Sequence, residues 1–174
     1  MSTTVPPYTA GLAGATTPPP AHRSRASRPG PSGHEPFGAL VELQLASCRR
    51  YGAGMAVMFI HLDGLVEIGE RHGADAQRSV ADAALKRLHS RLRNVDLITR
   101  VGVDTFGAAL FGVTGETAPR VEARVFDELS APYRVGDDVV EVTAITGTAV
   151  FPQGGHCATE LVRKADEARR VKVF

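Results

Sequence analysis

The fold is decided by two stretches, MAVMFIHLD at residues 55–63 and RVGVDTF at residues 100–106. The first is a nearly continuous apolar run, which is typical of a central strand covered on both faces. The second contains a tight turn, Gly102-Val103-Asp104-Thr105, that we expect to join strands Leu97–Val101 and Phe106–Phe111. Between the two stretches, apolar residues recur at four-residue spacing and predict a helix from about residue 76 to 93.

Regular patterns continue on both sides of this centre. They predict a helix from 37 to about 50, a helix over 118–129, a hairpin of Tyr133–Val135 and Val139–Val142, a strand Thr143–Phe151 and a last helix from about 158 to 170. The predicted order is α-β-α-β-β-α-β-β-β-α. It indicates an α/β sandwich with a mixed central sheet covered by helices.

Composition divides the chain near residue 35. Residues 1–34 hold seven of the eleven prolines and no acidic residue, so we expect residues 1–35 to form a disordered, proline-rich segment. A proline-rich docking arm is the alternative for this segment. Residues 36–174 are expected to form one folded domain.

Charge, cysteine usage and hydropathy restrict the class of protein. The net charge of +1 gives no indication of nucleic-acid binding. Cys48 and Cys157 fit neither a disulfide framework nor a metal-ligand spacing. No apolar run is long enough to span a bilayer, and the N-terminus has no apolar signal core. The expectation is a cytoplasmic protein without a membrane span.

The two central stretches together resemble the GGDEF family of diguanylate cyclases. His72-Gly73, Asp96, Arg100 and Phe106 fall where that family's pattern places them, as does the run TGTAVFP at 146–152. The resemblance covers roughly residues 37–173 and implies the GGDEF-type, nucleotidyl cyclase-like fold. Members of this family join two GTP molecules into cyclic di-GMP with the help of divalent cations.

The same resemblance implies that this chain is not an enzyme. The family takes its acidic metal ligands from the positions of His61 and Thr105, and neither side chain supplies the anionic oxygen that magnesium prefers. The eroded signature is Gly102-Val103-Asp104-Thr105-Phe106. Gly69 and Arg78 replace the base-reading residues, and Val66 replaces a phosphate-facing lysine. We therefore expect a degenerate diguanylate cyclase with no bound metal and no cofactor. His61 and Thr105 also admit a purely structural interpretation, as a strand end and a strand start.

An Arg-x-x-Asp sequence remains in this chain. In many GGDEF proteins such a sequence just before the signature forms a product-binding inhibitory site, and here five residues separate Asp96 from Gly102. The resemblance implies that Arg93, Asp96 and Arg124 bind cyclic di-GMP. Arg93 suits a phosphate or the acceptor edge of guanine, and Asp96 suits the N–H groups of guanine's opposite edge.

Two functions therefore remain open at the level of sequence. In the first, the chain is a cyclic di-GMP receptor and signalling effector that acts on a partner protein or joins two copies as a homodimer. In the second, it is a nucleotide-independent interaction scaffold in the same signalling pathway, and Arg93 and Asp96 have ordinary surface roles, such as a helix-end cation and a turn cap. Residual GTP binding without turnover is a third interpretation, disfavoured by Gly69 and Arg78.

Overall fold

The computed structural model describes residues 34–172, which form five helices and six strands over that range. The helices are α1 (His34–Tyr51), α2 (Leu65–His72), α3 (Ala74–Arg91), α4 (Ala118–Leu129) and α5 (Ala158–Val171). The strands are β1 (Met55–Asp63), β2 (Leu97–Arg100), β3 (Thr105–Phe111), β4 (Tyr133–Val135), β5 (Asp138–Val140) and β6 (Thr143–Phe151). The predicted proline-rich segment lies almost wholly outside the described residues.

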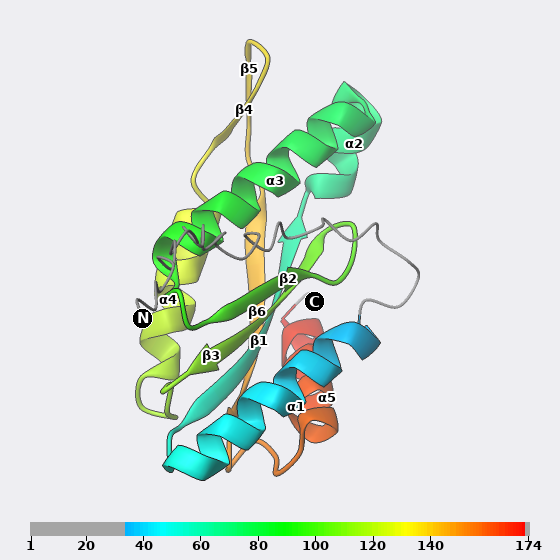
Figure 1. The fold of residues 1–174 in the computed structure, drawn as a ribbon. Helices are drawn as coiled ribbons and strands as arrows, with labels where there is room; N and C mark the ends of the chain where they lie inside the picture. The colour runs from blue at the N-terminus through cyan, green and yellow to red at the C-terminus, as the bar shows by residue number, and fades with distance from the viewer. Residues whose placement is uncertain (1–33, 173–174) are drawn as a thin grey trace, which may run out of the picture.

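The central sheet has the order β2-β3-β1-β6, and every pairing in it is antiparallel (Figure 1). The predicted mixed sheet was therefore wrong for the described residues. The reason is topological. The crossover through α2 and α3 returns the chain parallel to β1, but β3 inserts between β1 and β2. Strands that run in the same direction are thus never neighbours.

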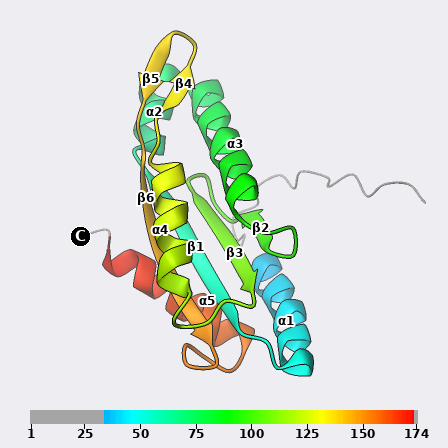
Figure 2. The same cartoon turned by 90° about the vertical axis from the view of Figure 1, so that its left-hand side faces the viewer.

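Side chains alternate along β1 and build two apolar layers. Ala56, Met58 and Ile60 pack with α2, α3 and α4, whereas Val57 and Phe59 pack with α1 and α5. Helices α3 and α4 cover one face of the sheet, and α1 and α5 cover the other. Figure 2 looks toward the broad side of β1 and β3, with α4 in front of the sheet. The apolar run at residues 55–62 is the central strand that the sequence predicts, and it is buried on both faces apart from partly exposed His61.

One helix was not predicted from the sequence. The short helix α2 begins after Gly64, whose φ is +90°, and Gly73, whose φ is +89°, separates it from α3. Only Leu65 and Ile68 of α2 are buried, so its apolar pattern is too short to reveal a helical period. The two glycines adopt the left-handed region at little steric cost.

Helix α5 lies unusually close to the sheet at Gly147 of β6. A methyl group built on Gly147 would lie 2.1 Å from the backbone nitrogen of Arg169 and 2.3 Å from the carbonyl oxygen of Ala165. Nothing larger than hydrogen fits between this strand and the helix. The helix backbone therefore fixes glycine at this position.

A buried carboxylate on α5 gives stability that depends on pH. Asp166 is 9% exposed and accepts hydrogen bonds from Arg169 at 2.6 Å and from Arg170 at 2.9 Å. Burial alone would raise the pKa of Asp166, but these hydrogen bonds outweigh burial and hold the pKa below its ordinary value of 3.8. The charged form is therefore favoured by folding.

We expect the stability supplied by Asp166 to be complete above pH 3.8 and to be lost as the pH falls below that value. In Asp166→Asn the free energy of unfolding at pH 7 should fall by about 1–3 kcal/mol, because charge-assisted bonds are lost. Urea denaturation at pH 7 and pH 3 measures both effects. An equal loss at the two pH values would contradict this origin.

Candidate functional site

The three residues predicted to bind cyclic di-GMP lie around one hollow. Arg93 and Asp96 come from the turn between α3 and β2, and Arg124 comes from α4. The hollow has a volume of about 100 Å³, and its floor is the end of β3, from Leu110 to Val113. At roughly 30 Å³ per water molecule it holds only a few waters. A nucleotide base would bind across the mouth of this hollow rather than inside it.

Asp96 has a structural role in addition to its predicted one. Its carboxylate accepts hydrogen bonds from the backbone N–H of Arg93 at 2.8 Å and of Phe111 at 3.1 Å. The backbone N–H of Asp96 in turn donates to the carbonyl oxygen of Arg93 at 2.9 Å. Asp96 thus caps the turn and ties it to the end of β3, leaving its remaining lone pairs for a ligand.

Arg93 and Arg124 are exposed, and neither side chain forms a hydrogen bond or ion pair with another of the residues 34–172. Both therefore keep all their guanidinium donors available. Two uncommitted guanidinium groups beside an anchored carboxylate suit a planar ligand that carries phosphate and also offers N–H donors. No apolar or neutral ligand would need this combination.

The signature turn is held by the chain itself. Arg100 donates to the carbonyl oxygens of Gly102, at 3.0 Å, and of Val103. The N–H groups of Val101 and Gly102 donate to the carbonyl oxygen of Thr105 at 3.0 and 3.1 Å. Thr105 begins β3, as predicted. The sequence alone did not assign this role to Arg100.

His61 and Thr105 are register partners on β1 and β3, so the two positions that the family resemblance assigns to metal ligands lie side by side. The Nδ1 atom of His61 is enclosed, forms no hydrogen bond and lies 3.5 Å from a carboxylate oxygen of Asp104. The hydroxyl of Thr105 donates to that same oxygen at 2.8 Å. Among these three side chains only Asp104 carries a carboxylate, and one of its oxygens accepts the hydrogen bond from Thr105.

The other positions that the resemblance assigns to nucleotide binding are Gly69, Arg78 and Val66. A side chain at Gly69 would meet the amide of Gln77, and Arg78 forms an exposed ion pair with Asp75. Val66 is 44% exposed and presents no charge. Among residues 34–172, no group of three or more histidine, cysteine or acidic side chains is arranged to hold a metal ion.

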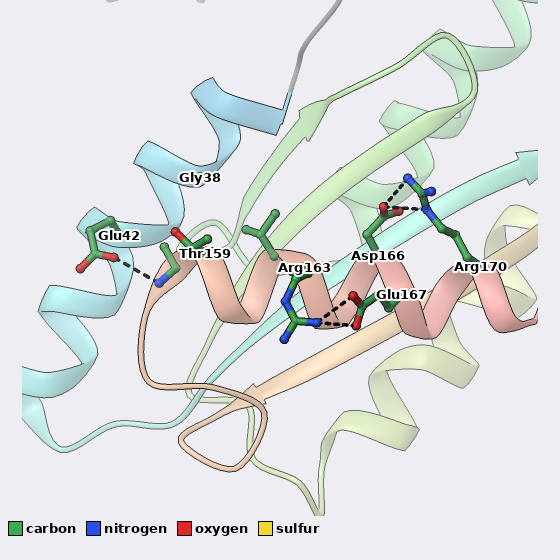
Figure 3. Close-up of a pocket in the computed structure, with 9 residues that line it drawn as sticks. Gly38, Glu42, Thr159, Arg163, Asp166, Glu167 and Arg170 are labelled. Carbon is green, nitrogen blue, oxygen red and sulfur yellow. Dashed lines mark hydrogen bonds and ion pairs between the residues drawn. The ribbon is translucent and has the colours of Figure 1, made fainter.

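A hollow of about 900 Å³ lies between α1 and α5. Figure 3 shows that its charged side chains are mostly engaged with one another. Arg163 pairs with Glu167 at 2.7 Å, and Glu42 of α1 accepts the first N–H of α5, from Ala158, at 3.2 Å. The first contact lies within α5 and the second joins α1 to α5, so we assign this region a role in helix packing.

Comparison with known proteins shows which family this chain belongs to. A family model for the diguanylate cyclase GGDEF domain matches residues 35–171. This chain belongs to the GGDEF family. The GGDEF domain described here is 32% identical to the diguanylate cyclase TpbB of Pseudomonas aeruginosa over 134 residues, which are 76% of this chain and 31% of TpbB.

Solved structures agree with the fold. A GGDEF domain of TpbB, also called YfiN, matches with a TM-score of 0.76 and 27% identity over 87% of each chain. The GGDEF domain of DgcB from Caulobacter crescentus, solved in complex with cyclic di-GMP, matches with a TM-score of 0.71 over 80% of this chain and 83% of that one. At 13% identity, that second match shows the fold alone. The chain spans less than a third of the length of the curated relatives it matches.

Within the part of the chain that the structure describes, no helix is both long and apolar enough to cross a bilayer.

Proposed function

We propose that this GGDEF domain is a catalytically inactive receptor for cyclic di-GMP. The observation that carries the proposal is the meeting of Arg93, Asp96 and Arg124 around one hollow, with both guanidinium groups uncommitted. These residues come from the α3–β2 turn and from α4, so their meeting depends on the fold and not on sequence proximity alone.

The proposal that the domain is catalytically inactive rests on the residues at the metal-ligand positions. Turnover of GTP in this family needs divalent cations, and His61 and Thr105 offer an enclosed imidazole nitrogen and a hydroxyl already hydrogen-bonded to Asp104. The base-reading positions, Gly69 and Arg78, offer no group equivalent to the asparagine and aspartate of the family pattern. Binding of the product nucleotide uses none of these residues.

A receptor of this kind transmits its signal through a surface. The ligand would bridge the α3–β2 turn and α4, and its second face would be presented to a partner protein or to a second copy of the chain. The nucleotide-independent scaffold remains the alternative. A receptor needs Arg93, Asp96 and Arg124 for its function, whereas a scaffold does not.

Titration calorimetry with cyclic di-GMP, with GTP as the comparison ligand, tests the proposal. We expect binding of cyclic di-GMP at micromolar or lower concentration, and no cyclic di-GMP formed from GTP and magnesium. Formation of the product would contradict the inactive assignment. Absence of heat with cyclic di-GMP, from protein shown by circular dichroism to be folded, would leave the scaffold function.

A further inference from the structure

Strand β6 forms one edge of the central sheet. It pairs with β1 on its inner side, and within residues 34–172 no strand pairs with its outer side. Figure 2 shows β6 running along the margin of the sheet beside α4. Its sequence, TAITGTAVF, contains no charged residue and no proline, the two features that usually protect an edge strand from pairing with another chain.

The hydrogen bonds at the two ends of β6 show which residues point outward. The N–H of Ala144 donates to the hydroxyl of Ser130, and the carbonyl of Val150 accepts from Gly154. Backbone groups alternate in direction along an antiparallel strand. Thr146 and Thr148 therefore also direct their N–H and C=O groups to the outer side, and no backbone group of the described residues pairs with them there.

Two hollows follow this edge, of about 510 Å³ beside Thr143–Thr146 and about 720 Å³ beside Thr148–Val150. We call them together the β6 groove. The hydroxyl oxygen of Thr148, in the larger hollow, is enclosed and has no hydrogen-bond partner. On the α4 side the smaller hollow is lined by Phe126, which is 45% exposed.

The two walls of the β6 groove carry opposite charges. The wall formed by α4 and the loop before it is acidic, with Glu116, Glu122 and Asp127. The wall formed by α5 is basic, with Lys164 and Lys172. An ion pair between Lys172 and Glu122, at 3.4 Å, joins the walls around the edge of the sheet. Both side chains are partly exposed, so exchanging this pair for other partners costs little.

We propose that the β6 groove binds an extended segment of another protein as an added strand. The side chains of that segment alternate, with acidic groups toward α5 and basic or apolar groups toward α4. Successive side chains of a strand point to opposite faces of a sheet, so one alternating segment satisfies both walls. The backbone groups of Thr146 and Thr148 supply the main-chain hydrogen bonds.

A second copy of this chain fits the β6 groove less well. Antiparallel pairing of β6 with itself needs a two-fold axis perpendicular to the sheet, which brings α4 beside α4 and α5 beside α5. The acidic wall would then face an acidic wall, and the basic wall a basic one. The charges therefore favour a different chain with alternating charge.

The test is a titration of the full chain, without nucleotide, with the peptide acetyl-KEVEKEVE-amide. Two further peptides carry N-methyl groups on alternate amides, one at the odd positions and one at the even positions. We expect the unmodified peptide to bind, and one methylated peptide to lose binding while the other retains it, because an added strand uses only one of its edges. Equal binding of all three peptides, or no binding of the unmodified peptide to folded protein, would overturn the proposal.

Charge reversal on the basic wall provides the protein-side test. Lys164→Glu should weaken the peptide about fivefold or more, since an attraction becomes a repulsion. Lys86→Glu, an equally exposed change on α3, is the matched control and should leave the affinity unchanged. Sedimentation of the chain alone shows whether it self-associates; a dimer that Thr148→Pro dissociates, without peptide binding, would assign the groove to a second copy and refute the proposal.

Discussion

Arg93→Ala and Arg124→Ala should each weaken cyclic di-GMP binding by about ten- to a hundredfold. Each removes a charged hydrogen-bond donor, a loss of about 1.5–3 kcal/mol, and about 1.4 kcal/mol corresponds to a tenfold change in affinity. Titration calorimetry of the two variants beside the unaltered chain measures the effect. Because both side chains are exposed and unpaired within residues 34–172, the folded structure should not change.

Arg134→Ala is the matched control for this pair. Arg134 is an exposed arginine on β4 and does not line the hollow, so its removal changes the net charge by the same amount. An equal loss of affinity in Arg134→Ala would mean that binding is a general charge effect. Unchanged affinity in both Arg93→Ala and Arg124→Ala would exclude the proposed site.

Asp96 is a poor first choice for this experiment. Its carboxylate holds the backbone N–H groups of Arg93 and Phe111, so Asp96→Ala would leave two donors without partners. Lost binding in that variant would report damage to the turn as much as a lost ligand contact. Substitution of either arginine tests ligand binding without disturbing the fold, whereas substitution of Asp96 would affect both binding and folding.

Gly147→Ala should destabilise the domain by more than about 3 kcal/mol, at or above the upper end of the usual cost of overpacking a core. The added methyl group would lie 2.1 Å from the backbone nitrogen of Arg169. A flexible side chain could move away, but a helix backbone must shift as a unit and draw Leu161 and Ala165 out of the apolar layer against β1. Chemical denaturation of the purified variant measures the loss.

Gly38→Ala is the matched control for the glycine substitution. Gly38 lies within α1, and a methyl group there would meet nothing within 4 Å. Alanine in a helix interior is favoured over glycine by about 0.5–1 kcal/mol, so this variant should be slightly more stable than the unaltered chain. A comparable loss in both variants would show that the close approach of α5 to β6 is not the cause.

The central strand β1 was predictable because it is a long apolar run. The run at 55–63 became β1 with both faces buried, and Thr143–Phe151 became β6 with the predicted bounds. Strand direction was not predictable in the same way, because the insertion of β3 between β1 and β2 is decided by contacts between residues far apart in the sequence. Helix α2 was missed because it is short and contains a glycine.

At the candidate site, the resemblance to GGDEF proteins implied Arg93, Asp96 and Arg124, and the fold brings them together. The sequence did not reveal that the Asp96 carboxylate also accepts a hydrogen bond from the backbone N–H of Phe111 in β3. That contact depends on how the turn lies against the sheet. The sequence did not reveal that the Nδ1 atom of His61, near the end of β1, is enclosed without a hydrogen bond. The sequence alone also did not show that the side chain of Asp104 accepts a hydrogen bond from the hydroxyl of Thr105.

The hydrogen bonds of Arg100 to the signature turn determine which residues of that turn can be substituted. A loop whose conformation depends on a bound nucleotide loses that conformation when the nucleotide is absent. Here the conformation of the turn is held by the guanidinium group of Arg100, which donates hydrogen bonds to the carbonyl oxygens of Gly102 and Val103. Residues at the tip of the turn can therefore be exchanged with little penalty in folding.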